Sequence, residues 1–166
     1  MDSSTTSTNR HGSAVITLPS DTEILITRIF DAPAELVFKA WTTPELVKRW
    51  WGGDRGVVTL ADIDLRVGGK WRFVMTANAG FEVAFHGEYQ QVDPPHRLVS
   101  TEVFEGFPDA AALSTMTLDD AGGVTTMTTL VTHESQEHRD MHINSGMEGG
   151  MQTAYDCLED LVRPPA

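Results

Sequence analysis

The block from Ile29 to Gly52 constrains the fold more than any other part of this chain. It opens with a β-rich stretch, after which two prolines each precede a run of helix-forming residues. Proline suits the first position of a helix, because its φ is already helical and the N–H it lacks would be unsatisfied there. The block therefore predicts a strand and two short helices, over Pro33–Trp41 and Pro44–Trp50, with Trp51 following the second.

The middle of the chain predicts one strand after another. Alternating apolar and polar residues are separated by short segments rich in Gly, Pro, Asp and Asn, which tight turns favour. Strands joined by such short turns pair as an antiparallel meander. The expected strands are Glu23–Phe30 before the helices and, after them, Gly56–Arg66, Lys70–Thr76, Phe81–Val92, Arg97–Phe104, Leu113–Leu118 and Val124–His133.

The last part of the chain predicts one long amphipathic helix over Met147–Arg163. Its apolar residues recur at helical spacing, and acidic residues fill the opposite face. Ser145 and Glu148 have the spacing of a capping box, which would start this helix. We therefore expect an α+β fold in which a curved antiparallel sheet of seven strands grips the C-terminal helix. The two short helices would lie between strands 1 and 2.

A chain of 166 residues is most simply one domain, here expected over residues 21–163 after a flexible N-terminal tail over residues 1–20. The net charge of −12 argues against nucleic acid or an anionic membrane as a partner. No apolar stretch reaches the roughly 18 residues that a membrane span needs. The single cysteine, Cys157, fits a reducing compartment, so we expect a cytoplasmic monomer or homodimer.

Five motifs occur in an order that resembles a known superfamily. They are the block from Phe30 to Gly52, the turn Arg66–Trp71, and the segments His86–Tyr89, Val92–Val99 and Gly146–Met151. Together they are similar to the START-like superfamily, whose members are also called SRPBCC or helix-grip proteins. Within it they resemble the branch of the activator of heat-shock protein 90 ATPase, over about residues 22–163.

The resemblance implies a deep pocket between the sheet and the C-terminal helix. Relatives of this kind bind or act on hydrophobic small molecules such as lipids, polyketides and plant hormones. The eukaryotic namesake stimulates the ATPase of a chaperone, but this chain shows no second region like the extra domain of that co-chaperone. One fold hosts many activities, so the function has to be argued from the site itself.

A pocket in that position would be lined by the inner face of the sheet and by the covering helix. Flexible, polarizable methionines suit a pocket that adapts to varied apolar ligands, although they also serve simply to fill a core. The predicted ligand-binding residues are Trp51, Trp71, Phe73, Met75, His86, Glu88, Met116, Met127, Met147, Met151 and Tyr155.

The sequence leaves open the orientation of two of these residues, His86 and Glu88. They alternate on one face of their strand and could exchange a proton if that face pointed into the pocket. Phe81, Val83 and Phe85 occupy the other face, which favours an outward orientation for His86 and Glu88. We therefore assign no catalytic residue.

The polar run that ends at His142 is a candidate metal site. Glu134, His138 and His142 recur every four residues and would share one face of a helix. The first and third would then lie about 12 Å apart along the helix axis, which is too far for one ion. We interpret the run as a solvent-exposed helix and expect neither a metal nor a cofactor.

Three functions are compatible with these features. The leading hypothesis is non-enzymatic binding of a small hydrophobic molecule, or shielding of an apolar segment of a protein partner. The second is an enzyme of the cyclase or hydrolase kind, which would need two titratable groups facing each other inside the pocket. The third is a chaperone activator, for which a charged outer face would matter more than the pocket.

Overall fold

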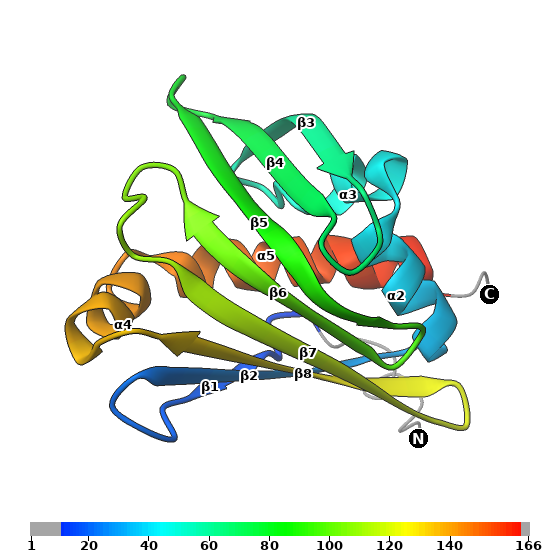
Figure 1. Cartoon of the computed structure of the whole chain (residues 1–166). Coiled ribbons are helices and arrows are strands. Elements are labelled where there is room, and N and C mark those ends of the chain that lie inside the picture. Colours follow the sequence, from blue (N-terminus) through cyan, green and yellow to red (C-terminus); the bar gives the residue numbers. More distant parts are fainter. Residues whose placement is uncertain (1–10, 164–166) are drawn as a thin grey trace.

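A single antiparallel sheet dominates the computed structural model, which describes residues 11–163 (Figure 1). Its strands follow the order β1-β2-β8-β7-β6-β5-β4-β3. The expected α+β fold with a curved sheet and a C-terminal helix is confirmed. The strands are β1 (Val15–Thr17), β2 (Glu23–Phe30), β3 (Gly56–Ile63), β4 (Lys70–Ala77), β5 (Glu82–Asp93), β6 (Arg97–Phe104), β7 (Ala112–Ala121) and β8 (Val124–His133).

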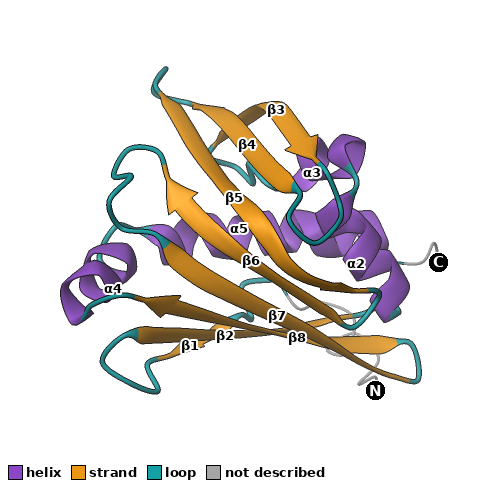
Figure 2. Cartoon of the chain, viewed as in Figure 1, coloured by secondary structure: helices purple, strands orange, loops and turns teal. Residues whose placement is uncertain are grey.

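The helices all lie on the concave side or at the ends of this sheet. They are α2 (Ala34–Thr42), α3 (Pro44–Trp50), α4 (Gln136–Ile143) and α5 (Met147–Val162). Figure 2 shows α5 running behind the strands, with α2 and α3 near its C-terminal end and α4 near its N-terminal end. No helix within residues 11–163 has the length and apolar composition needed to cross a lipid bilayer.

The sheet has eight strands where the sequence predicts seven. The additional strand, β1, falls inside the predicted flexible tail and pairs with β2 through Ile16 and Ile26. Distant contacts decide its position, because the N–H of Ala14 donates to Gln152 of α5 and the carbonyl of Ala14 accepts from the same side chain. Such a contact leaves no trace in the local sequence pattern. Residues 1–10 of the predicted tail lie outside the described residues.

The hydrophobic core is divided into two clusters. The larger one joins α2 and α5 to β2, β7 and β8, and its centre includes Phe30 and Leu158, both fully buried. The smaller one consists of Val47, Ala61 and Phe73, beneath α3. Partly buried Trp51, Ile63 and Trp71 pack against both clusters. The boundary between the two clusters is therefore formed by large side chains that keep some exposure.

The C-terminal half of α5 is attached to β2 by a buried ion pair. The guanidinium of Arg28 contacts the carboxylate of Glu159, and both side chains are fully buried. Arg28 also donates to Asp156 at 3.1 Å and lies over the ring of Phe30, 4.8 Å from its centroid. The second carboxylate oxygen of Glu159 accepts the backbone N–H of Asp31. These contacts fix one end of the helix relative to the sheet.

Candidate functional site

Aromatic rings from three strands and from the residue that follows α3 form a continuous apolar surface on the concave face. Phe73 pairs with Phe85 and Phe85 pairs with Phe104 across the sheet, so their side chains share one face. The rings of Phe85 and Phe104 lie 5.1 Å apart, and those of Trp71 and Phe73 lie 4.9 Å apart. Trp51, which follows α3, lies edge-on to Phe73 at 5.5 Å and to Phe85 at 5.7 Å. We call these five residues the aromatic wall.

The aromatic wall is incompletely covered. Phe73 is buried, but Trp51, Trp71 and Phe85 are only partly buried, and Phe104 at the β6 end is 40% exposed. A cluster of aromatic rings that keeps this much exposure is an apolar surface available to a ligand.

A carboxyl group stands beside the aromatic wall on the inner face of β6. The register that pairs His86 with Val103 and Tyr89 with Ser100 sets Glu102 opposite Gly87, next to Trp71. Glu102 shares a face of β6 with Phe104, and its charge acts on Tyr155 of α5. Among the described residues, Glu102 has no hydrogen-bond or ion-pair partner for its side chain.

Burial governs the protonation of this pair. It raises the pKa of Glu102 from 4.5 to about 7, because the charged form loses its hydration. Burial, followed by the charge of Glu102, raises the pKa of Tyr155 far above its ordinary value. At neutral pH the tyrosine is therefore a hydroxyl group and the carboxyl titrates.

This titration predicts a pH dependence of stability. The folded protein keeps the Glu102 proton at a higher pH than the unfolded chain, so the stability from this group is present below pH 4.5 and lost as the pH rises through 7. Between about pH 5 and about pH 8 we expect the free energy of unfolding of the wild type to fall by about 1–3 kcal/mol more than that of Glu102→Gln. Urea unfolding at a series of pH values measures this difference, and parallel curves for the two proteins would contradict it.

Apart from His86 and Glu88, the predicted ligand-binding residues divide into three groups. Trp51, Trp71 and Phe73 lie together in the aromatic wall, as described above. Met147 and Met151 lie at the start of α5, partly buried and packed against the larger cluster. The third group is buried in the core, with exposures of 9% or less, and comprises Met75, Met116, Met127 and Tyr155.

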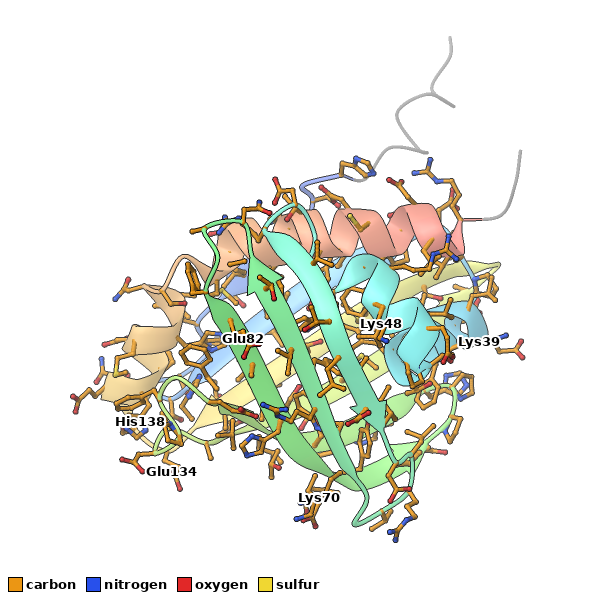
Figure 3. All side chains as sticks on the ribbon, turned by 90° about the horizontal axis from the view of Figure 1, so that it is seen from above. Lys39, Lys48, Lys70, Glu82, Glu134 and His138 are labelled. Atoms are coloured by element: carbon orange, nitrogen blue, oxygen red, sulfur yellow. The ribbon has the colours of Figure 1, made fainter. Side chains whose placement is uncertain are left out.

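The structure places His86 and Glu88 on the outer face of the sheet. Arg72 and Lys70 are their partners across β4 and share that face. His86 Nδ1 lies 2.9 Å from a carboxylate oxygen of Glu105. Each of the two carboxylate oxygens of Glu105 also accepts one hydrogen bond from Arg72. Arg72 and then His86 lower the pKa of Glu105 to about 2. Figure 3 shows Lys70 at the end of β4 that is distant from α5. These two predicted site residues are thus separated from the aromatic wall.

The candidate metal ligands do not converge. Glu134 precedes α4, the ring of His138 lies edge-on to Phe107, and His142 Nδ1 lies 3.0 Å from Nε2 of His133. Figure 3 places Glu134 and His138 at the α4 end of the molecule, opposite Lys39 and Lys48. Within residues 11–163, no three His, Cys, Asp or Glu side chains are grouped so that they could hold a metal ion.

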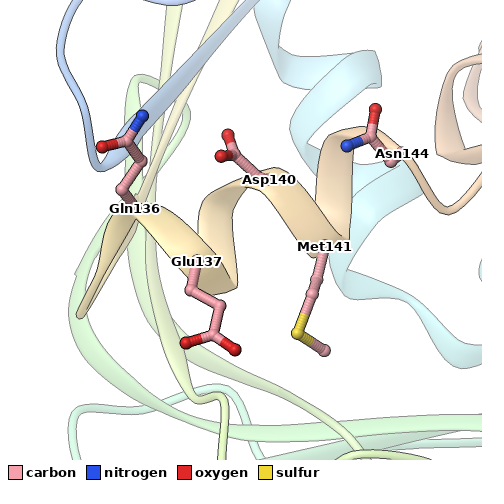
Figure 4. A pocket seen from close by; sticks show the side chains of 5 residues that line it. All are labelled: Gln136, Glu137, Asp140, Met141 and Asn144. Atoms are coloured by element: carbon pink, nitrogen blue, oxygen red, sulfur yellow. The ribbon is translucent and has the colours of Figure 1, made fainter.

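Two surface hollows lie away from the aromatic wall. One, of about 580 Å³, follows α4 (Figure 4) and is lined by Gln136, Glu137, Asp140, Met141 and Asn144. The other, of about 340 Å³, is lined mainly by α2, α3 and the end of α5, including Leu36, Leu46 and Leu161. Neither of these two hollows includes a residue of the aromatic wall.

The start of α5 lacks the local features that hold a helix end rigid. Its N-cap is Gly146, with φ of 84° and no capping side chain, and Gly149 and Gly150 follow within the first turn. Each glycine costs about 1 kcal/mol relative to alanine inside a helix. The predicted capping box is wrong, because the Ser145 hydroxyl donates to the carbonyl of His142 instead. The pliable end of α5 is therefore opposite to the end held by Arg28.

Sequence reasoning missed Glu102, the polar residue nearest the wall. Leu98, Ser100, Glu102 and Phe104 alternate with Val99, Thr101 and Val103 along one strand. Both sets combine apolar and polar residues, so the alternation does not say which one faces inward. The aromatic residue at Phe104 was the one available signal, because aromatic rings favour the inner face.

Comparisons with known proteins agree with this architecture. The family model described as Activator of Hsp90 ATPase homolog 1-like protein matches residues 31–163. No curated protein matches the chain. A crystal structure of a protein from Rhodobacter sphaeroides is 28% identical, with a TM-score of 0.83, and the match covers 90% of this chain and 97% of that one.

Two further solved structures are similar over nearly the same length. Protein Ms6760 from Mycobacterium smegmatis is 25% identical, with a TM-score of 0.81, and the match covers 92% of this chain and 99% of that one. A protein from Arthrobacter aurescens is 26% identical, with a TM-score of 0.81, and the match covers 92% of each chain.

Proposed function

This chain belongs to the Activator of Hsp90 ATPase homolog 1-like family, and on that premise we propose that it binds a small hydrophobic molecule between the aromatic wall and the start of α5. The observation that carries the proposal is the incomplete cover of the wall. Four of its five rings keep some exposure although they lie on the concave face of the sheet. An apolar ligand would remove that surface from water at a gain of about 25 cal/mol per Å².

The position of the flexible side chains also supports binding here. Met147 and Met151 are unbranched, lie at the uncapped end of α5 and are only partly buried. Methionine side chains repack around ligands of different shape at little cost. The core beneath the other end of α5 would keep the fold intact while the first turns move.

The test is the binding of Nile red, a neutral dye whose fluorescence rises in apolar surroundings. We expect saturable binding to the wild type and a dissociation constant raised about tenfold by Trp71→Ala and by Met151→Ala, because each loses part of an apolar contact. His138→Ala should stay within twofold of the wild type, since the ring of His138 packs against Phe107 and not against a ring of the wall. Thermal unfolding verifies that each variant is folded. Equal effects of all three substitutions would contradict the proposal.

An acid–base enzyme acting on a hydrophobic substrate is the second candidate function. One observation favours it, which is that the charge of Glu102 acts on Tyr155, so two titratable groups interact on the inner side. A carboxyl group with a pKa of about 7 suits proton transfer at neutral pH. Turnover of a hydrophobic ester that is abolished by Glu102→Gln would favour the enzyme over the binding protein.

A further inference from the structure

A group of polar side chains without partners lies on the inner face of β6 and β7. Ser100 pairs with Ser114, and Glu102 pairs with Ala112, in the same alternation that points Leu98 and Met116 into the core. Among residues 11–163, neither the two serine hydroxyls nor the Glu102 carboxyl has a side-chain hydrogen bond. The buried Thr129 hydroxyl, on the neighbouring strand opposite Met116, also has none. These groups form a polar strip beside the aromatic wall.

These groups differ in burial. The Thr129 hydroxyl is fully buried, whereas the side chains of Ser100, Glu102 and Ser114 are only partly buried. A buried polar group is normally hydrogen-bonded, and partly buried ones without a protein partner are free to bond to a ligand. Since this strip adjoins the aromatic wall, a single molecule could cover the rings with its apolar part and satisfy Glu102 with its polar end.

The groups around Glu102 restrict what that polar end can be. The carboxyl accepts hydrogen bonds and repels a second carboxylate. Tyr155 on α5, on which the charge of Glu102 acts, keeps its proton and can donate or accept. The buried guanidinium of Arg28 is already paired with Glu159 and Asp156. An ammonium group has no acceptor for the Tyr155 hydroxyl, whereas a hydroxyl group both donates and accepts. A neutral group that donates to Glu102 and accepts from Tyr155 fits all of these neighbours.

We propose that Glu102 is the polar anchor of the site and that the ligand is an apolar molecule ending in a hydroxyl group. The ligand hydroxyl donates to the Glu102 carboxyl and accepts from the Tyr155 hydroxyl, while the apolar part lies on the aromatic wall under Met147 and Met151. This inference rests on the proposed function, because it assigns the polar end of a molecule bound at that site.

The experiment compares four unbranched molecules that differ in the end group. Decanol, 1-methoxydecane, decylammonium and decanoate are titrated against the complex of the protein with Nile red. The proteins are the wild type, Glu102→Leu, Tyr155→Phe and, as the matched control, Glu88→Leu on the outer face of the neighbouring strand. Tyr155→Phe removes one oxygen and keeps the ring, so it tests the site even if Glu102→Leu does not fold.

We expect the wild type to bind decanol about tenfold more tightly than 1-methoxydecane, as for one hydrogen bond to a charged group. Glu102→Leu should bind decanol and 1-methoxydecane with equal affinity. Tyr155→Phe should bind decanol about threefold more weakly than the wild type does, with no change for 1-methoxydecane. Glu88→Leu should have the affinities of the wild type.

Three results would overturn the inference and leave the proposed function standing. They are equal wild-type affinity for decanol and 1-methoxydecane, tightest binding of decylammonium or decanoate, and a decanol preference that persists in both Glu102→Leu and Tyr155→Phe. If the wild type binds neither Nile red nor any of the four molecules, the proposed function itself fails.

Discussion

Replacing Glu159 by alanine should lower the free energy of unfolding by about 3–5 kcal/mol. The substitution leaves the Arg28 guanidinium fully buried with Asp156 as its remaining carboxylate, at 3.1 Å. It also removes the acceptor of the Asp31 backbone N–H. Breaking one side of a buried ion pair is costly, because the charge that stays behind has lost its hydration without recovering its partner.

The matched control for this prediction lies on the same helix. Asp160 is 57% exposed and pairs with His11 at the surface, so Asp160→Ala should change stability by less than about 1 kcal/mol. Urea unfolding at neutral pH compares the two variants. A loss below 1 kcal/mol for Glu159→Ala would mean that the C-terminal half of α5 is not held by Arg28. It would also remove the reason for assigning mobility to the opposite end of the helix.

Replacing Trp50 by alanine should have an effect of similar size, about 3–5 kcal/mol. Trp50 is 1% exposed, and its indole N–H donates to the carbonyl of Ala40 at 2.9 Å. Its ring lies 4.5 Å from that of Trp41 and 6.4 Å from that of Tyr155. The truncated side chain would leave a cavity between α2, α3 and α5 and an unpaired carbonyl.

The adjacent tryptophan provides the control, because the two rings have different surroundings. Trp51 is only partly buried and belongs to the aromatic wall. We expect Trp51→Ala to lose less than half the stability that Trp50→Ala loses, and to weaken Nile red binding. Thermal unfolding and dye titration of both variants separate the two roles. Equal losses of stability would show that Trp51 is also a structural anchor, and the aromatic wall would lose its proposed role.

The elements that rest on local chemistry were predictable from the sequence. The prolines before α2 and α3 and the turn residues between strands act within a few positions, and the structure has helices and strands where these signals occur. Strand β1 was not predictable, because Ala14 immediately before it is held by Gln152, more than a hundred residues away. The start of α5 was misjudged since a serine near a helix start can bond to the preceding helix instead of capping its own.

The candidate site was predictable only in part. Trp71 and Phe73 could be identified as neighbours, because alternation along β4 and the covering helix require apolar residues on the inner face. The orientation of His86 was left open by sequence, and it is set by the pairing of β5 with β4. Glu102 could not be found, because a carboxyl on a strand gives no local sign that it will face a helix more than forty residues later in the chain.

The most direct test of the central claim is a nuclear magnetic resonance titration of the protein with ¹³C-labelled methionine methyl groups. Met147 and Met151 lie at the proposed site, and Met141 lies in the separate hollow along α4. Adding Nile red should shift the Met147 and Met151 methyl signals in a saturable way and leave the Met141 signal unchanged. Shifts confined to Met141, or an unchanged spectrum at saturating dye, would contradict binding between the aromatic wall and α5.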